Sequence, residues 1–373
     1  MHVVFVADTL TIGGTELNAV RTAEALVSRG ITPTLVHFQP DGPLLGRYAA
    51  LGLRIINYPV VPFSSPRALV RAWQLGHLLR ELRPDVVHAH DVYANIYCAA
   101  ARTAFPRMPL VTSRRWAHSV PRPILMPVNA MAHRLSRAVV ANSMELVPLL
   151  RTEGVAASRV HVWPNFISPA AAVQLSAAER TAWRLRLGVP TDATVVVCVA
   201  RLAPVKRHAD LIHAFATARA DHPDLHLLLV GDGPSESALR ELVASIGIGD
   251  ATTFAGHLSA TPLPQQLGDI AILMSENEGF PNSLVEALMC GLPVIASRTG
   301  GTNEILDGGR NGIAVDVGDI PAAAAAIAAF VGDAERRRVT GSDGRRFALA
   351  RYSEDSSISA LRAAYAHAAT GTA

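Results

Sequence analysis

Short apolar runs alternate with helical segments along most of the chain, and this alternation restricts the possible folds more than any other feature of the sequence. Runs at 3–7, 34–38 and 85–88 are typical of buried strands, whereas segments 16–28 and 66–82 have the apolar spacing of helices. Strands and helices in strict alternation predict a parallel sheet that is covered by helices on both faces.

The alternation breaks near residue 165 and then starts again, which indicates a second sheet. The further strands expected are 110–112, 138–140, 194–200, 225–230, 270–274 and 293–296, and the further helices 209–220, 235–246, 284–290 and 356–369. The expected class is α/β, with two Rossmann-like, doubly wound parallel-sheet domains facing across a cleft. The ligands of such sheets lie beyond the carboxyl ends of the strands.

The domain boundaries follow from the same break. We expect an N-terminal domain at 1–165, a linker at 166–190, where alanine and proline are frequent, a C-terminal domain at 191–355 and a final helical segment at 356–373. A length of 373 residues suits two domains.

Composition excludes several classes of protein. Half of the residues are apolar and 17% are charged, which is unlike a disordered chain. The longest apolar stretch, 321–331, is about half of what a membrane span needs. The first residues read as a strand rather than a secretion signal. Three dispersed cysteines favour neither a disulfide framework nor a zinc site. We therefore expect a cytoplasmic protein.

Charge is distributed unevenly along the chain. Residues 1–165 hold 17 Arg and 9 acidic residues, a net +8, whereas the remainder holds 16 Arg, one Lys and 22 acidic residues, a net −5. The basic half suits an anionic ligand, an anionic membrane surface or nucleic acid. Lys206 is the only lysine, which hints that its position needs an ammonium group.

Two glycine-containing segments follow predicted strands. Gly13 and Gly14 come after the first strand and open a helix, where backbone amides and the helix dipole favour an anion. Gly231 and Gly233 end the strand at 225–230 and leave room for a base. A tight turn without a ligand explains each pair equally well, and the G-x-G-x-x-G pattern is absent.

Two cations follow the first strand of the second half. Arg201 stands at the strand end and Lys206 five residues later, across a turn that contains proline. Such a pair can converge on one diphosphate, with the arginine as a fork and the lysine as a point charge. Solvated loop charge is the competing interpretation.

The segment 275–293 carries the most information. A strand ends near residue 274, and a helix is expected to begin at about Ser283, with its positive end suited to phosphate. Glu278 lies in the intervening loop, where a carboxylate suits sugar hydroxyls. Glu286 has two explanations, because Ser283 and Glu286 also fit a capping box that needs no ligand.

These segments together carry a family resemblance. Glu278 and Glu286 with Gly279-Phe280-Pro281 and Gly291-x-Pro293, preceded by Arg201 and Lys206, by Gly231-x-Gly233 and by Gly13-Gly14, resemble family four of the nucleotide-sugar glycosyltransferases. The order and spacing match over nearly the whole chain. The resemblance implies the glycosyltransferase-B (GT-B) architecture, with the donor in the C-terminal domain and the last helix packed back on the N-terminal one.

The resemblance also implies a role for each matched residue. Arg201 and Lys206 would hold the donor diphosphate and stabilise the charge that develops on it. Glu278 would orient the transferred sugar, and Glu286 would bind the ribose. The remaining donor-side residues are backbone and loop positions at the phosphates, the sugar and the base: Gly13, Gly14, Gly231, Gly233, His257, Gly279, Phe280, Pro281, Asn282 and Ser283.

The chemistry implied is retaining transfer without a metal or another cofactor. A nucleoside diphosphate sugar, with uridine or guanosine as its base, is the co-substrate. The acceptor hydroxyl attacks the face that the diphosphate leaves, and a phosphate oxygen takes the proton. Glu278 and Glu286 are then not the acid and base pair of a hydrolase.

The acceptor side departs from the family pattern. Many relatives have a histidine after the fourth N-terminal strand, where this chain has Arg114, which cannot act as a base at neutral pH. We place Arg114, Arg115 and His90 on the acceptor side. For His90, a hydrogen-bonded structural histidine is the favoured interpretation, and the pair His88 and His90 lacks further zinc ligands.

Seven arginines among apolar residues at 102–137 suggest contact with a membrane. Such a surface suits anionic lipid on the inner face of the cell membrane, close to a lipid-linked acceptor. Nucleic acid is not expected as a partner, because no aromatic platform or reader module accompanies the charge.

The sequence thus predicts a hexosyltransferase that acts on a hydroxyl of a glycan, a lipid-linked saccharide or a small molecule. Two rivals remain on the same architecture. A nucleotide-sugar epimerase would convert the donor without an acceptor, and a non-catalytic protein would bind the sugar nucleotide only.

Overall fold

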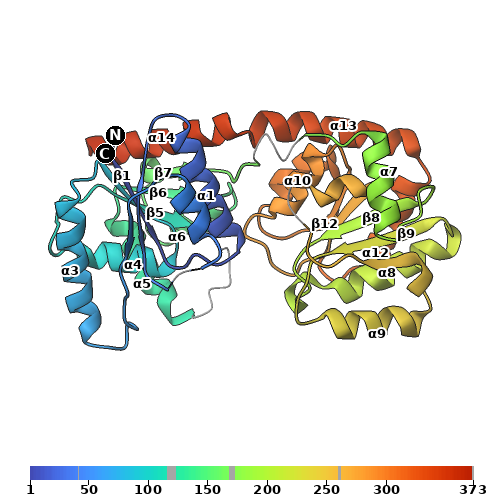
Figure 1. Cartoon of the computed structure of the whole chain (residues 1–373), viewed down its shortest axis with the longest axis horizontal. Coiled ribbons are helices and arrows are strands. Elements are labelled where there is room, and N and C mark those ends of the chain that lie inside the picture. The colour runs from blue at the N-terminus through green and yellow to red at the C-terminus, as the bar shows by residue number, and fades with distance from the viewer. Residues whose placement is uncertain (41, 116–122, 168–172, 259–261, 372–373) are drawn as a thin grey trace. The chain divides into compact units, whose positions relative to one another are not determined.

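The computed structural model describes residues 1–40, 42–115, 123–167, 173–258 and 262–371. The chain divides into two compact units (Figure 1). The N-terminal unit combines Met1–Phe166 with Glu354–Ala373, and the C-terminal unit is Ile167–Ser353.

The N-terminal unit contains a sheet of seven strands in the order β3-β2-β1-β4-β5-β6-β7, paired in parallel throughout. Its strands are β1 Val3–Ala7, β2 Thr34–His37, β3 Ile55–Asn57, β4 Val86–Ala89, β5 Leu110–Arg114, β6 Ala138–Ala141 and β7 Val160–Val162. Its helices are α1 Gly14–Val27, α2 Leu45–Ala50, α3 Arg67–Glu81, α4 Val92–Ala101, α5 Met126–Leu135, α6 Leu146–Thr152 and α14 Glu354–Thr370.

Strand β1 shows why helices must cover both faces of this sheet. All five of its residues are buried, and alternate side chains of a strand point to opposite faces. Val3 and Phe5 pack with α1 and α14 in one apolar core. Val4 and Val6 pack with α3 and α4 in another. A continuous apolar run is therefore what a central parallel strand needs.

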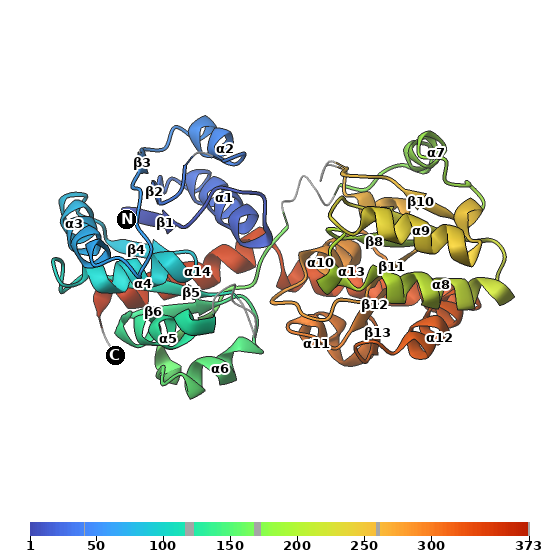
Figure 2. The same cartoon turned by 90° about the horizontal axis from the view of Figure 1, so that it is seen from below.

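The C-terminal unit repeats the plan with six parallel strands in the order β10-β9-β8-β11-β12-β13. Figure 2 shows the same elements from below. Its strands are β8 Thr194–Val199, β9 Leu225–Val230, β10 Thr252–Phe254, β11 Ile270–Leu273, β12 Val294–Ser297 and β13 Gly312–Val315. Its helices are α7 Ala177–Arg186, α8 His208–Asp221, α9 Glu236–Ile246, α10 Asn282–Met289, α11 Thr302–Leu306, α12 Ile320–Val331 and α13 Ala334–Arg351.

Helices cover both faces of the second sheet as well. Helix α8 packs against α9 and α12, and α10 packs against α13. In Figure 1 the first group lies below the strands of this unit and the second group above them. The predicted α/β class with two doubly wound parallel sheets is confirmed.

The expected linker at 166–190 is wrong over most of its length. Residues 168–172 lie outside the described residues, but α7 lies within the predicted linker and belongs to the C-terminal unit. Ser176 and Glu179 cap this helix with reciprocal hydrogen bonds. Arg180 and Arg184 then fix it to the unit, because both pair with the carboxylate of Asp269 at 2.7 and 2.8 Å.

Helix α14 packs on the N-terminal unit although it ends the sequence. Its buried side chains Ile358, Leu361 and Tyr365 belong to the core that contains Val3 and Phe5. At its start, Glu354 pairs with Arg29 at the end of α1, at 2.5 Å. The chain therefore returns to its first domain after completing the second.

Candidate active site

The strand order of the C-terminal sheet reverses between β8 and β11. The chain moves outward in one direction through β9 and β10 and in the other through β12 and β13. The loops that follow β8 and β11 consequently diverge, and a crevice at such a reversal is where open α/β sheets bind ligands. The candidate residues Arg201 and Glu278 lie in these two loops.

Two of the predicted catalytic residues meet at this reversal. Lys206 ends a single helical turn, Pro204–Lys206, after β8, and its Nζ lies 2.5 Å from Oε1 of Glu278 in the loop after β11. The hydroxyl of Ser275 donates to the same carboxylate oxygen at 2.6 Å. A backbone bond from Glu276 N to Val205 O, 2.9 Å long, ties the two loops together.

The environment of this ion pair is largely closed. The side chains of Lys206 and Glu278 are 23% and 11% exposed, so both charges are mostly withdrawn from water. Arg201, at the end of β8, is exposed and forms no ion pair with any described residue. The loop after β8 thus carries one exposed guanidinium and, five residues later, an ammonium that a carboxylate already neutralises.

His208 lies in the same region and was not singled out by the sequence analysis. It is buried at the first residue of α8, and neither of its ring nitrogens has a hydrogen-bond partner among the described residues. Burial and, secondarily, the charge of Lys206 lower the pKa of His208 to about 4. The imidazole is therefore neutral at physiological pH.

The glycines after β9 have a structural explanation that was left open above. Gly231 and Gly233 adopt φ angles of 135° and 155°, which only glycine takes readily. A Cβ atom on them would collide with the carbonyl oxygens of Ala200 and Leu202, respectively. The glycines therefore let the β9 loop lie directly against the loop that carries Arg201. Their predicted contact with a base stays a prediction, as does that of exposed His257.

Helix α10 begins at Asn282, one residue earlier than expected. Pro281 occupies the cap position without a side-chain hydrogen bond, so Ser283 and Glu286 lie within the helix and the capping-box interpretation of Glu286 is wrong. Instead, Oε2 of Glu286 accepts a hydrogen bond from Nε2 of Gln265 at 2.9 Å. Gln265, which the sequence analysis missed, therefore positions this carboxylate.

Phe280 is a core residue of the loop before this helix. Its ring is buried and packs edge-on against Tyr352, with the ring centroids 5.4 Å apart. Pro281 is buried too, whereas Asn282 and Ser283 are partly accessible. Any donor contact by Phe280 can only involve its backbone. The side chain serves to anchor the loop between Glu278 and α10.

A fourth loop, after β12, also reaches the site and was not predicted. Gly300 has a φ of 47°, and a Cβ atom there would collide with the carbonyl oxygen of Glu278. The next amide, that of Gly301, donates to the carbonyl of Gly279 at 3.2 Å. The adjacent glycines at 300 and 301, between a strand and α11, were the available signal.

The N-terminal sheet has its own reversal, between β1 and β4. Asp8 follows β1 and accepts hydrogen bonds from the amides of Tyr93 and Ala94, at 2.9 and 2.5 Å. Burial, with a further contribution from Asp91, raises the pKa of Asp8 well above its usual value. Gly13 caps α1 in an extended conformation, so the Gly13 and Gly14 turn has no left-handed residue. Its contact with donor phosphates stays a prediction.

Of the two histidines near the end of β4, the hydrogen-bonded one is His88 and not His90, for which this role was predicted. His88 bonds to the hydroxyls of Tyr365 and Ser113, at 2.7 and 2.8 Å. His90 is equally buried, yet both of its ring nitrogens lack partners among the described residues. It packs against the rings of His88 and Phe5. The interpretation of His90 as a hydrogen-bonded structural residue is therefore wrong.

Both candidate arginines on the acceptor side are buried. Arg114 ends β5 and forms an ion pair with Glu153 at 3.0 Å. Arg115 lies over the ring of Trp163, 4.3 Å from its centroid, and donates to Oδ1 of Asn165 at 3.1 Å. Burial lowers the pKa of Arg115 to about 10. Each guanidinium therefore has a structural partner, and contact with an acceptor stays a prediction.

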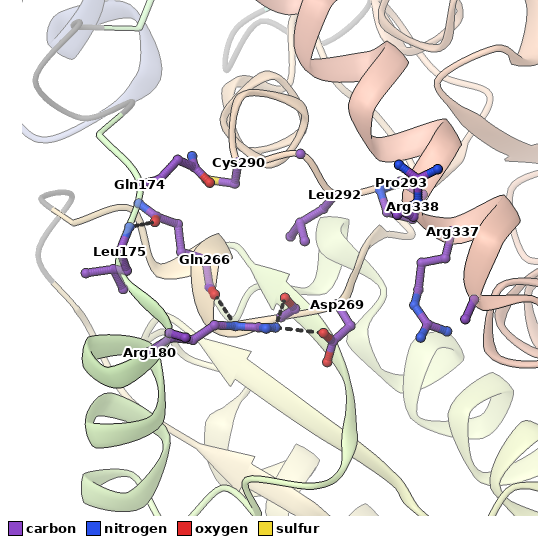
Figure 3. Close-up of a pocket in the computed structure, with 14 residues that line it drawn as sticks. Gln174, Leu175, Arg180, Gln266, Asp269, Cys290, Leu292, Pro293, Arg337 and Arg338 are labelled. Atoms are coloured by element: carbon purple, nitrogen blue, oxygen red, sulfur yellow. Dashed lines mark hydrogen bonds and ion pairs between the residues drawn. The ribbon is translucent and has the colours of Figure 1, made fainter.

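Figure 3 shows a pocket that lies elsewhere in the C-terminal unit. It has a volume of about 470 Å³ and borders Gly268 and Pro293, which precede β11 and β12. It is therefore at the amino ends of the strands, opposite the Lys206 and Glu278 pair. Arg180 and Asp269 form its floor, and Arg337 and Arg338 of α13 line one side.

Metals and membrane spans can be considered only for the described part of the chain. There, no group of three or more histidine, cysteine, aspartate or glutamate side chains is placed to hold a metal ion. No helix among those residues is both long and apolar enough to span a bilayer. Burial raises the pKa of all three cysteine thiols, as expected of unreactive structural positions.

Two family models match consecutive parts of the chain. Glycosyltransferase Family 4 matches residues 12–171, and Glycosyl transferases group 1 matches residues 179–347. These ranges fall on the N-terminal and C-terminal units. Two doubly wound parallel-sheet domains of this kind define the GT-B fold. The chain belongs to the family-4 type of these proteins.

Two curated relatives match about half of the chain. It is 29% identical to an N-acetyl-alpha-D-glucosaminyl L-malate synthase of Bacillus anthracis over 50% of this chain and 49% of that protein. It is 31% identical to a GDP-mannose-dependent phosphatidylinositol monomannoside mannosyltransferase of Mycolicibacterium smegmatis over 52% and 53%. The chain thus spans about half the length of these relatives.

Other matches extend over almost the whole chain. The lipopolysaccharide core glycosyltransferase LpsE of Rhizobium meliloti is 25% identical over 92% of this chain and 93% of its own. The crystal structure of Anabaena HepE with UDP superposes with a TM-score of 0.86 at 22% identity, over 98% of this chain and 100% of that one. This likeness extends the agreement in fold to both units.

Proposed function

We propose that this protein is a retaining, metal-independent glycosyltransferase. It transfers a hexose-type sugar from a nucleoside diphosphate sugar to a hydroxyl of a glycan, a lipid-linked saccharide or a small acceptor. The observation that carries the proposal is the meeting of Lys206, Glu278 and Ser275 at the strand-order reversal of the C-terminal sheet. Family membership supports the same class of reaction.

In the proposed donor complex, Arg201 and Lys206 bind the diphosphate. Arg201 is exposed and available to an incoming anion, and Lys206 is kept at the site by Glu278. The amino end of α10 adds backbone amides and the positive end of a helix dipole. The three groups together compensate the charge that accumulates on the diphosphate as the glycosidic bond breaks, which is the largest contribution to rate in such reactions.

The two glutamates bind neutral parts of the donor. Glu278 accepts hydrogen bonds from hydroxyls of the transferred sugar while its other contacts, to Lys206 and Ser275, fix its orientation. Glu286, held by Gln265, binds the ribose hydroxyls. Carboxylates suit these tasks because each oxygen accepts hydrogen bonds from hydroxyl groups.

The proposed transfer balances without a separate base. The acceptor oxygen forms a bond to the anomeric carbon on the face that the diphosphate leaves. The bond from that carbon to the diphosphate breaks, and its electron pair remains on the leaving phosphate oxygen. The acceptor proton passes to an oxygen of the same diphosphate. Because cationic side chains supply the compensating charge, we expect turnover to persist in the presence of a chelator.

Two substitutions test this assignment. Lys206→Ala and Glu278→Ala should each reduce the rate of sugar transfer by at least about a hundredfold, because each removes an interaction that acts in the transition state. Glu335→Gln is the matched control, since Glu335 forms only an exposed ion pair with Arg338. Transfer at a near wild-type rate by either alanine variant would exclude the proposed site.

The donor must be identified before that assay. One relative is named as GDP-mannose-dependent, and HepE was crystallised with UDP and with UDP-glucose. A thermal-shift panel of uridine, guanosine and adenosine diphosphate sugars would select among them, because a bound donor stabilises the folded protein according to its affinity. Consumption of the selected donor only with an acceptor indicates transfer. Consumption without one indicates an epimerase, and binding alone a non-catalytic protein.

We further propose that the N-terminal unit docks on an anionic membrane surface. Helix α5 and the turn before it expose Ile124, Val128, Met131 and Leu135, with 82%, 47%, 49% and 44% of each residue accessible. Spacings of four, three and four residues place them on one helical face. Arg134, which is exposed, lies beside Leu135 in sequence. An apolar stripe with a flanking cation fits the interface of an anionic bilayer.

Vesicle sedimentation tests this docking. The protein should sediment with phosphatidylglycerol vesicles at low salt and remain in solution with phosphatidylcholine vesicles. Ile124→Ser with Met131→Ser should abolish sedimentation. Leu69→Ser with Trp73→Ser is the control, because these exposed apolar residues lie on α3 instead. Equal sedimentation of both double variants would contradict a role for α5.

A further inference from the structure

Four arginines surround a second pocket of the N-terminal unit, of about 330 Å³. Arg102, Arg134, Arg137 and Arg159 line it together with His367 of α14. Arg137 immediately precedes β6, so the pocket lies at the amino ends of the strands. Asp8 and His90 lie at the carboxyl ends of the strands, so this pocket is on the opposite side of the sheet from them. It has no part in the proposed transfer reaction.

The arginines donate to carbonyl groups at helix ends. Arg137 bonds to the carbonyl of Ala368 in α14 at 2.8 Å. Arg134 bonds to that of Glu153, which ends α6, at 2.5 Å. Arg102 bonds to the carbonyl of Leu135 in α5. Arg159 bonds to the carbonyls of Arg134 and Ser136, at 2.9 and 3.0 Å, beside the same end of α5.

These partners do not balance the charge of the pocket. Three helix carboxyl ends carry about −0.5 elementary charge each, or about −1.5 in total, against four guanidinium groups. None of the described residues that line the pocket is acidic. The carboxylate of Glu153 is in an ion pair with Arg114, and the charge of Arg134 acts on it as well, so these two arginines share it. Before any share of the Glu153 charge, about 2.5 positive charges remain uncompensated.

Two properties of Arg102 show the effect of this surplus. Its Nε is buried and has no hydrogen-bond partner among the described residues. Burial and then the neighbouring charge of Arg137 lower the pKa of Arg102. A buried, unpaired donor beside like charges costs free energy, and an anion in the pocket would offset the repulsion between the like charges.

The larger pocket in Figure 3 shows what a compensated arginine pocket looks like. There the lining residues Arg180 and Asp269 form an ion pair, and Arg338 pairs with Glu335 of the same helix, which lies outside the lining. Carboxylates of the protein itself thus supply the negative charge. The pocket around Arg137 has the same cationic lining without them, and this difference makes it a candidate for an external anion.

We propose that the pocket lined by Arg102, Arg134, Arg137 and Arg159 binds a phosphate group. A phosphate dianion compensates most of this surplus of about 2.5 charges, and its oxygens accept hydrogen bonds from the paired N–H groups of guanidinium. The phosphate is either free in solution or the headgroup of an anionic lipid. The second source has a geometric basis, because Leu135 both lines the pocket and ends the exposed apolar stripe of α5.

Calorimetric titration of inorganic phosphate into the Lys206→Ala protein tests the proposal. This background removes one of the two cations proposed for the donor diphosphate and weakens binding there, and the part of phosphate binding that the pocket substitutions remove reports on the pocket. Arg159→Gln and Arg137→Gln should each weaken binding at least about tenfold, the effect of losing one charge-assisted hydrogen bond. Arg337→Gln is the matched control, because Arg337 also donates to a carbonyl at a helix end, that of Phe330.

A parallel experiment separates the two sources. Vesicles that contain phosphatidic acid are compared with vesicles of phosphatidylcholine alone. Phosphate binding that depends on Arg159 identifies a free anion as a sufficient ligand. Binding to phosphatidic acid that depends on Arg159, without affinity for free phosphate, identifies a headgroup site. If neither ligand binds, or if the Arg159 and Arg137 variants bind like the control, the pocket is no phosphate site. Circular dichroism establishes that each variant is folded.

The outcome is independent of the proposed transferase activity. Failure of the Lys206 and Glu278 variants to lose activity would leave the phosphate titration unchanged, since the two sites lie in different units. Conversely, a pocket without affinity for phosphate would leave the donor site as proposed.

Discussion

Lys206 and Glu278 neutralise each other's charge in the unliganded protein, so replacing either one affects the stability of the fold. The carboxylate is the less exposed of the two, at 11% against 23%. Removal of Lys206 leaves a mostly buried anion whose remaining side-chain partner among the described residues is Ser275, whereas removal of Glu278 leaves a cation with better access to water. A charge left unpaired in a protein interior is strongly destabilising. Lys206→Ala should therefore be the less stable variant, and activities are best compared well below its unfolding temperature.

His133 should make the N-terminal unit sensitive to acid. Burial, with a smaller effect of Arg114, lowers its pKa to about 3. The ring is held by Thr112 and Asn129, at 2.9 Å each. An unfolded histidine has a pKa of about 6.5. Below about pH 6.5, His133 binds a proton in the unfolded state but stays neutral in the native state. The free energy of unfolding therefore falls as the pH decreases towards 3.

Urea denaturation at pH 7 and pH 5 measures this effect. The contribution of His133 to the loss of stability between these pH values is about 2 kcal/mol. His133→Gln should show a correspondingly smaller loss than the wild type, even if its stability at pH 7 is reduced. His213→Gln, at an exposed histidine of α8, is the control. An unchanged loss in the His133 variant would refute the argument.

At the level of single residues, the sequence revealed charge but not geometry. Lys206 was identifiable because it is the only lysine in the chain. Glu278 was identifiable because it precedes Gly279-Phe280-Pro281, where a carboxylate is not needed to cap a helix. Ser275 and Gln265 were missed because a serine or glutamine in a loop carries no local signal. Their importance comes from tertiary contacts with Glu278 and Glu286.

Among the secondary-structure elements, the central strands were predictable and the edge strands were not. Every predicted strand corresponds to an interior strand of one of the sheets, and the four that escaped prediction, β3, β7, β10 and β13, are the four edges. Strands β3, β7 and β10 span three residues each, and none of these residues is fully buried. A strand that pairs on one side only needs no continuous apolar run, so periodicity cannot detect it.

Helix α14 contributes directly to the core of the N-terminal unit. Leu361→Ala should therefore destabilise that unit by about 2–5 kcal/mol, the usual effect of removing a fully buried leucine side chain. Scanning calorimetry measures the change. Leu349→Ala on α13 is the matched control, because that leucine is exposed and belongs to the other unit. Equal effects of the two substitutions would show that α14 does not support the N-terminal core in solution.

The two units of the molecule have opposite net charge. The N-terminal unit has a formal charge of +7 and the C-terminal unit one of −4. A diphosphate is thus proposed to bind in the acidic unit, where the overall field opposes it. Local groups must overcome this field. Arg201, Lys206 and the amino end of α10 are therefore needed for binding itself as well as for the chemical step.

The separation into two units leads to a prediction for the intact protein. The donor contacts proposed for Arg201, Lys206, Glu278 and Glu286 lie in the C-terminal unit, whereas Leu361→Ala disturbs the core of the N-terminal unit. Calorimetry with and without the selected nucleoside diphosphate sugar should therefore show two separable effects. At a hundred times its dissociation constant the donor stabilises its unit by about 2.7 kcal/mol, and Lys206→Ala should remove that shift. Leu361→Ala should lower the other transition and leave the donor shift in place. A single transition that responds equally to donor and to Leu361→Ala would mean that the units unfold together, because each could then no longer melt without the other.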